Sequence, residues 1–304
     1  MKLRYCLLVL LLFIVACAQT QELGEEPSPT ACPYICLPGN AGVETTVNHP
    51  KDDGTVFVND RMAPRIKVED VGEASIEGGF VCLTGLNEEA FQGVSRCDCE
   101  AFSIDLDDPD ALPYDDVTFS TALVTDEAVG DQDLTVYTRY SYSTFGIFEL
   151  CISGDPDNEK ECDTSSTENR LVVSSAAPVE ITSVTQTLTP QGGDAVALRV
   201  NIEAEMHTDA NQELIPIDDA TNDACVLEIT DTVPVDVTFV LFEDEHAGAC
   251  STLQFRDGED AAHVTCKFEV DTATLVGKKE WRGYVRLDYG FQEIQSVRFT
   301  VTAE

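Results

Sequence analysis

The sequence contains few positive charges, only four histidines and a single tryptophan. Lys and Arg together number 18 against 56 Asp and Glu, which gives a formal net charge of −38. A field of this sign repels phosphate backbones and anionic headgroups, so we expect no nucleic-acid partner. With 304 residues and 43% hydrophobic content, the chain is nevertheless long and apolar enough to build one large core or two ordinary ones.

The sequence motifs of the common catalytic sites are also missing. The chain has no GxSxG, HExxH, P-loop or GxGxxG pattern, and its histidines are scattered. A metal site around His207 or His246 is a weaker interpretation than a solvated acidic loop. Paired carboxylates carry no information, because among 56 acids some pair always lies at a suitable separation. We therefore predict no catalytic residue, no transition-metal site and no enzyme.

The N-terminus has the pattern of an export signal. Residues 1–4 carry two positive charges, and the apolar run over residues 5–16 is shorter than the roughly 20 residues that a membrane-spanning helix needs. The tetrapeptide Ile14-Val15-Ala16-Cys17 resembles the lipobox of prokaryotic lipoproteins. This resemblance implies a signal peptide over residues 1–16 and lipidation of Cys17, which anchors the exported chain to the membrane. The alternative is cleavage nearby, with Cys17 left as a free thiol.

The rest of the chain divides into a tether and a strand-rich region. Residues 18–50 contain five prolines and little periodicity, which predicts a flexible tether over residues 17–54. From about residue 55 onward, apolar residues alternate with polar ones, as in the segment from Val196 to Ala204. This period predicts half-buried antiparallel strands, and the fold class is therefore all-β.

An internal repeat suggests two related domains. Residues 136–152 align without a gap on residues 285–301, an offset of 149, so that aromatic and aliphatic positions coincide. A shorter echo places residues 116–119 over residues 236–239. Small, turn-prone residues at 173–178 lie between the copies and mark the predicted boundary.

Two strand-rich repeats behind a lipid anchor resemble the tandem Ig-like or fibronectin-like sandwiches of bacterial and archaeal cell-surface lipoproteins. Residues 179–184, followed by the alternating strand over 195–206, carry the resemblance in the second copy. The pattern departs from the immunoglobulin one, because Trp281 follows all the cysteines. The resemblance implies antiparallel Ig-like β-sandwiches over residues 55–175 and 179–304.

Twelve cysteines indicate an oxidising compartment. Without Cys6 and Cys17, ten remain, which fits five disulfides. Two pairs flank predicted turns and are expected to close hairpins: Cys151 with Cys162, and Cys250 with Cys266. Four others keep several pairings open, among them a bridge between the domains: Cys82, Cys97, Cys99 and Cys225. The Cys-Asp-Cys sequence at residues 97–99 favours two cysteines that each take part in a separate disulfide over a pair of metal ligands.

Acidic residues crowd two segments at a spacing that suits hard cations. The candidate calcium ligands are Asp105, Asp107, Asp108 and Asp110 in the first segment, and Asp155 and Asp157 in the second. Both segments lack the glycine and the terminal glutamate of an EF-hand. General acidity that keeps the surface hydrated at high ionic strength is the favoured interpretation, and it fits the seven lysines. We expect no cofactor, with Ca²⁺ as the alternative.

These observations favour a non-enzymatic display or binding module, exported and held by lipid on the extracytoplasmic side of the membrane. Its partner is then an envelope or cell-surface component that the sequence does not identify. A structural spacer of the envelope ranks second and an envelope enzyme of unrecognised type third. Aromatic residues make up only 8% of the chain, and the cluster Tyr137, Tyr140 and Tyr142 lies on a predicted strand, which favours core packing over a platform for sugars.

Overall fold

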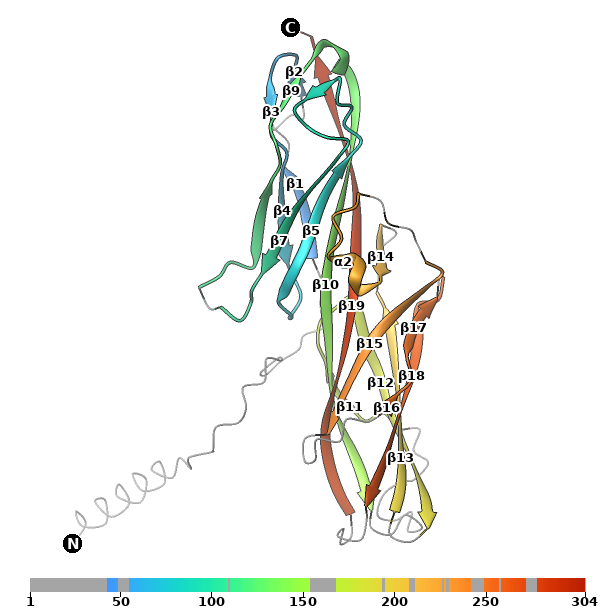
Figure 1. The fold of residues 1–304 in the computed structure, drawn as a ribbon. Helices are drawn as coiled ribbons and strands as arrows, with labels where there is room; N and C mark the ends of the chain where they lie inside the picture. Colours follow the sequence, from blue (N-terminus) through green and yellow to red (C-terminus); the bar gives the residue numbers. More distant parts are fainter. Residues whose placement is uncertain are drawn as a thin grey trace, which may run out of the picture. The chain divides into compact units, whose positions relative to one another are not determined.

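The computed structural model describes residues 43–48, 55–108, 110–153, 168–192, 195–207, 211–225, 227, 230–241, 249–256, 258–271 and 278–303. These residues confirm the all-β prediction, since strands make up most of them (Figure 1). Within the described part of the chain, helical structure is limited to the turn η1 (Asp126–Ala128) and the short helix α2 (Ile217–Ala220). No described helix has the length and apolar character needed to cross a membrane.

Two long strands form the centre of the largest sheet, β10 (Gly130–Ser153) and β19 (Lys278–Thr302) (Figure 1). They pair antiparallel without a break from Gly130 opposite Val301 to Ser153 opposite Lys278. The strand order is β17-β15-β19-β10-β5-β7. The other strands of this order are β5 (Ile76–Thr84), β7 (Cys97–Ile104), β15 (Thr232–Leu241) and β17 (Leu253–Arg256). Three more pair at the side: β2 (Thr55–Phe57), β11 (Leu171–Ser174) and β14 (Gln212–Ile215).

Three smaller sheets complete the fold. One has the order β1 (Val43–Asn48), β4 (Arg65–Asp70), β8 (Tyr114–Thr118). Another has the order β12 (Val179–Gly192), β13 (Ala195–Met206), β18 (Ala261–Asp271), β16 (Ala249–Cys250). The third has the order β3 (Arg61–Met62), β9 (Ala122–Val124), β6 (Phe91–Gln92). Side chains join the first two of these sheets to the central one, for example Thr45 bonded to Thr138 and Phe268 packed on Phe239.

Strand alternation explains how the sheets bury their inner faces. In β13 the residues Val196, Leu198, Val200 and Ile202 are all buried, while their neighbours are partly or fully exposed. This confirms the alternation predicted for that segment. The buried side chains merge into one continuous hydrophobic core, which is the main source of stability.

The two copies of the internal repeat lie side by side as partners. Ser141 pairs with Gly290, and 290 − 141 = 149, the offset of the repeat. An antiparallel pair with this register has a local two-fold axis through that residue pair. Tyr140 and Tyr289 are equivalent at this offset, and they make equivalent hydrogen bonds. The Tyr140 hydroxyl accepts from the Val43 amide at 3.1 Å, and the Tyr289 hydroxyl accepts from the Val179 amide at 3.2 Å. Val43 begins β1 and Val179 begins β12, so each tyrosine fixes the first residue of the facing sheet.

The strand pairing bears on the predicted domain ranges in two ways. The gap between the two predicted ranges, residues 176–178, falls between β11 and β12, yet residues 278–301 of β19 from the second range pair with β10 from the first. The range predicted as tether, 17–54, contains the strand β1, because Val43, Thr45 and Val47 pair with β4. Independent Ig-like folding of residues 55–175 and 179–304 stays a prediction.

Candidate functional site

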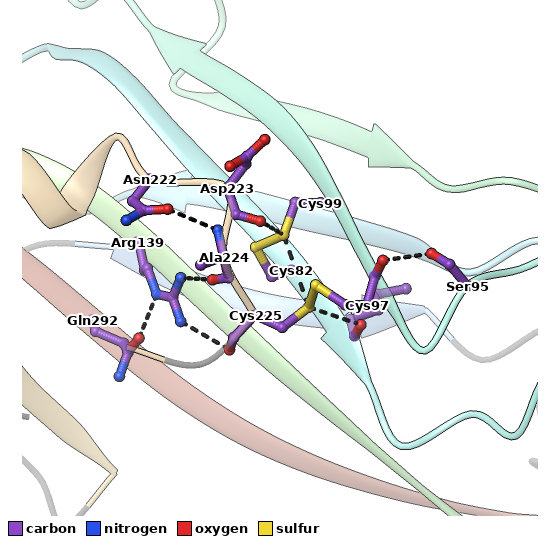
Figure 2. Close-up of a disulfide and its surroundings, with 11 residues drawn as sticks. Cys82, Ser95, Cys97, Cys99, Arg139, Asn222, Asp223, Ala224, Cys225 and Gln292 are labelled. Atoms are coloured by element: carbon purple, nitrogen blue, oxygen red, sulfur yellow. Dashed lines mark hydrogen bonds between the residues drawn. A yellow bond between two sulfur atoms is a disulfide. The ribbon is translucent and has the colours of Figure 1, made fainter. Parts of the chain in front are cut away.

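Two disulfides meet where β7 runs along β5 (Figure 2). One joins Cys82 of β5 to Cys99 of β7, which are direct cross-strand neighbours. The other joins Cys97 of β7 to Cys225, which follows α2. Residues two apart in a strand share a face, so Cys97 and Cys99 present their sulfurs to the same side of β7. The Sγ atoms of Cys99 and Cys225 are only 3.9 Å apart, which makes the two disulfides one cluster.

The cysteine residues of this cluster differ in exposure to solvent. Cys82 is fully buried and Cys225 is 7% exposed, whereas Cys97 is exposed. Carbonyl oxygens also surround the inner sulfurs: that of Asp223 lies 2.9 Å from Cys99 Sγ, and that of Leu83 lies 3.5 Å from Cys225 Sγ. The cluster is therefore open on the Cys97 side and closed on the Cys82 side.

The fully buried guanidinium of Arg139 holds the segment that carries Cys225 (Figure 2). Arg139 lies on β10, and its two terminal nitrogens donate to the carbonyl oxygens of Ala224 and, at 2.9 Å, of Cys225. Its Nε donates to Oε1 of Gln292, which lies opposite Arg139 on β19. A buried cation is stable only when its donors are satisfied, so the position of the 224–225 backbone is tied to this side chain.

Carboxylates beyond the first contacts balance the buried charge. Gln292 extends the hydrogen-bond network, because its Nε2 donates a hydrogen bond to Oε1 of Glu213 on β14. Burial lowers the pKa of Arg139, while the charges of Asp219 in α2 and of Glu213 act in the opposite direction. The site thus joins five elements, namely β5, β7, β10, β14 and β19, through hydrogen bonds and disulfides.

Chemically, the cluster offers two functions besides crosslinking. A disulfide with a second disulfide sulfur in contact can exchange partners once one thiolate is released. In addition, the Sγ atoms of Cys82, Cys99 and Cys225 lie within 4.8 Å of one another, and as thiolates they would form a soft donor set. In the oxidised state described here these sulfurs are bonded to carbon and sulfur only, so exchange is the chemistry that the arrangement supports.

A second buried polar group lies at the end of β4. Asp70 is 6% exposed, and its Oδ1 accepts from the Gly72 amide at 2.8 Å. Its Oδ2 is buried and has no hydrogen-bond partner among the described residues. Burial raises the pKa of Asp70 to about 6, and the Gly72 hydrogen bond offsets only part of this effect. The pKa of Tyr142 is raised mainly because this side chain is itself buried, and then because the negative charge of Asp70 lies nearby.

The predicted calcium ligands of the first segment lie in the connection between β7 and β8. There the side chains of Asp105 and Asp108 accept from the backbone amides of Asp107 and Asp110, each at 3.0 Å, as in Asx turns. In the described ranges, no three carboxylates of this connection come within 4.8 Å of one another. Asp155 and Asp157 lie outside the described residues, as does Cys17. Calcium binding and lipidation therefore stay predictions.

The predicted pairing of Cys250 with Cys266 is confirmed, but the bond does not close a hairpin, because β17 lies between β16 and β18 in the chain and pairs with β15 instead. Cys250 is bonded to Cys266 across β16 and β18, as predicted from the sequence. Cys151 is disulfide-bonded, but Cys162 lies outside the described residues, as do Cys32 and Cys36. The Cys97–Cys225 disulfide joins the two predicted domain ranges, which is one of the pairings that the sequence allowed.

The sequence reasoning missed Arg139 and Asp70. Asp70 had a signal, because it continues the buried alternation of Ile66 and Val68 and therefore faces the core. Arg139 had a weaker one, a lone cation beside Tyr140 in a strand of a chain poor in Lys and Arg. Neither a protein-family model nor a curated protein matches the chain by sequence.

Proposed function

We propose that the protein is a non-enzymatic, lipid-anchored module that displays a rigid β-scaffold on the outer side of the membrane for binding to an envelope or cell-surface partner. The observation that carries this proposal is the unbroken pairing of β10 with β19, which joins strands from both halves of the chain in one nine-stranded sheet. A display module must keep its loops in fixed positions, and long strands that pair across the two halves of the chain favour this.

The disulfides and the high negative charge support the same function. The disulfides Cys82–Cys99, Cys97–Cys225 and Cys250–Cys266 suit an oxidising exterior, and each typically contributes about 2–4 kcal/mol. The high negative charge disfavours nonspecific adhesion, so short-range contacts decide which partner binds. A spacer of the envelope is the second candidate, because the same rigid framework also suits a purely structural role.

Anchoring is tested by Cys17→Ala, with Cys6→Ala as the matched control. We expect the first variant to leave the membrane fraction, because it lacks the acylated residue, and the second to stay there. Cell fractionation with immunoblotting and mass spectrometry of the mature N-terminus provides the measurement. A wild-type protein that is soluble after export contradicts the anchor.

Binding is tested by crosslinking the full-length protein on intact cells and identifying what it captures. We expect one recurring envelope component, and we expect its capture to be lost when an exposed connection between strands is replaced. Uniform capture of abundant proteins by wild type and variants alike favours the spacer. A substrate turned over by the purified protein, with turnover abolished by one substitution, overturns the non-enzymatic proposal.

Calcium is tested by thermal unfolding. If calcium binds the folded protein, CaCl₂ raises the melting temperature more than NaCl of the same ionic strength does. Equal shifts indicate general screening of the acidic surface and exclude a specific site.

A further inference from the structure

The disulfide cluster on β7 contains a sulfur with two neighbours to which it can be bonded. Cys99 is bonded to Cys82 across the sheet, and its Sγ is 3.9 Å from that of Cys225. A disulfide bond is about 2.0 Å long, so side-chain rotations that close this gap by about 2 Å would form Cys99–Cys225. Cys99 therefore lies between two alternative partners with little movement of the backbone.

The Cys97–Cys225 bond has one accessible end. Cys97 is exposed and Cys225 is buried, so a thiolate from solvent attacks at Cys97 and Cys225 becomes the leaving group. Arg139 donates to the backbone carbonyl oxygen of Cys225 at 2.9 Å, so the backbone of the leaving cysteine stays held when its thiolate forms.

We propose that this cluster is a thiol–disulfide exchange site, whose substrate is a thiol-bearing partner, in particular a protein dithiol, that reacts at Cys97. In the first step the partner's thiolate bonds to Cys97 Sγ, the Cys97–Cys225 bond breaks, and Cys225 leaves as a thiolate. In the second step Cys225 Sγ bonds to Cys99 Sγ, the Cys82–Cys99 bond breaks, and Cys82 leaves and takes a proton from water. Neither exchange changes the total number of disulfides.

The mixed disulfide between Cys97 and the partner then has one of two fates, depending on whether the partner carries one thiol or two. With a monothiol the partner stays covalently attached to Cys97. With a dithiol the partner's second thiolate attacks the partner's own sulfur in the mixed disulfide, the partner leaves oxidised, and Cys97 keeps the electron pair and takes a proton from water. Each chain oxidises one dithiol in this way and is left reduced at Cys82 and Cys97, so the exchange is stoichiometric and not catalytic turnover.

Exchange preserves the scaffold around Arg139. In both disulfide isomers Cys225 remains bonded to β7, first through Cys97 and then through Cys99, so the segment after α2 stays in place. What changes is the crosslink between β5 and β7, and the backbone hydrogen bonds of those paired strands hold them together without it. The exposed Cys97 can therefore bind a thiol-bearing partner covalently while the hydrogen bonds of Arg139 stay in place. This inference goes beyond the display function and does not depend on the lipid anchor.

The decisive experiment uses Cys82→Ala, which leaves Cys99 as a free thiol beside the Cys97–Cys225 bond. Exchange transfers the free thiol to the exposed Cys97, where the leaving thiolate is solvated. After acid quench, the protein is alkylated in acidic denaturant and mapped by peptide mass spectrometry without reduction. We expect more than half of the label from the cluster on Cys97; label confined to Cys99 overturns the proposal. In the matched control Cys250→Ala, whose free thiol lies in a different sheet, the label should stay on Cys266 and the cluster should stay unlabelled.

A second measurement covers the case in which Cys82→Ala does not fold. The unaltered protein is treated with substoichiometric dithiothreitol, quenched and mapped in the same way. Exchange predicts label on Cys82 together with Cys97, and a Cys99–Cys225 peptide. Label restricted to Cys97 and Cys225, with Cys82–Cys99 intact, shows that the two disulfides react independently and overturns the proposal.

Discussion

The buried carboxyl of Asp70 should make the protein less stable as the pH rises through the range from 4 to 6. Burial raises the pKa of Asp70 from its ordinary value of 3.8 to about 6, so the folded state binds the proton more tightly than the unfolded state. Stability then falls with pH between these two values and is lowest above the folded pKa. A gap of roughly two pKa units corresponds to about 3 kcal/mol of destabilisation at pH 7.

The variant Asp70→Asn isolates this contribution, because it keeps an oxygen for the Gly72 amide and cannot ionise. We expect the variant to be more stable than wild type by about 1–3 kcal/mol at pH 7, where the lower end allows for a buried amide without a partner. Near pH 4 the advantage should vanish, since wild-type Asp70 is then largely protonated. Urea unfolding, followed through the buried indole of Trp281, measures this difference at each pH.

The matched control separates Asp70 from the general acidity of the chain. Glu77→Gln removes the same charge at an exposed position of β5, and its stability curve should run parallel to that of wild type between pH 4 and 8. Parallel curves for Asp70→Asn as well, or an Asn variant less stable than wild type at pH 8, would refute the reasoning.

Three further substitutions test the packing described above, each by urea unfolding with disulfides intact. Arg139→Met should destabilise by about 3–5 kcal/mol, because it leaves buried carbonyl oxygens without their donors. Gly283→Ala should cost about 1–3 kcal/mol, since a Cβ there would lie 2.5 Å from the Phe148 ring. Tyr289→Phe should cost about 1–2 kcal/mol, because the Val179 amide loses its acceptor. A change below about 0.5 kcal/mol in any of them contradicts the corresponding contact.

Strand positions could be predicted from the sequence where one face of a strand is buried. The period of two across residues 195–206 corresponds to β13, and the flanking of a turn by Cys250 and Cys266 corresponds to a real disulfide. Both signals are local, because the alternation lies within one strand and the two cysteines are only 16 residues apart. The gapless alignment of residues 136–152 with 285–301 also reflects a real equivalence of the two central strands.

Pairings between distant strands could not be predicted in this way. The echo between residues 116–119 and 236–239 is misleading, because β8 pairs with β4 in a small sheet whereas β15 pairs with β19. Short strands with similar alternation occur in every sheet, so four matching residues do not determine which strand lies beside which. The cluster around Arg139 depends on such pairings, and the sequence therefore left the partners of Cys97 and Cys225 open.

The two-fold relation between the copies shows which buried groups the framework does not require. Asp70 pairs with Val43 at the start of β1, and in the other copy Met206 pairs with Val179 at the start of β12. Arg139 corresponds at the offset of 149 to Asp288, which is partly exposed and contacts Arg286 instead of the core.

One copy of the framework therefore forms with an apolar residue in place of the buried carboxyl, and without a buried cation at the second position. The polar groups of the N-terminal copy destabilise the core unless they are paired, as the orphaned Oδ2 of Asp70 illustrates. Three of the four cysteines in the clustered disulfides lie beside the same copy, on β5 and β7, whereas Cys225 follows α2. Asp70 and Arg139 are therefore groups of one copy that the shared two-fold framework does not require.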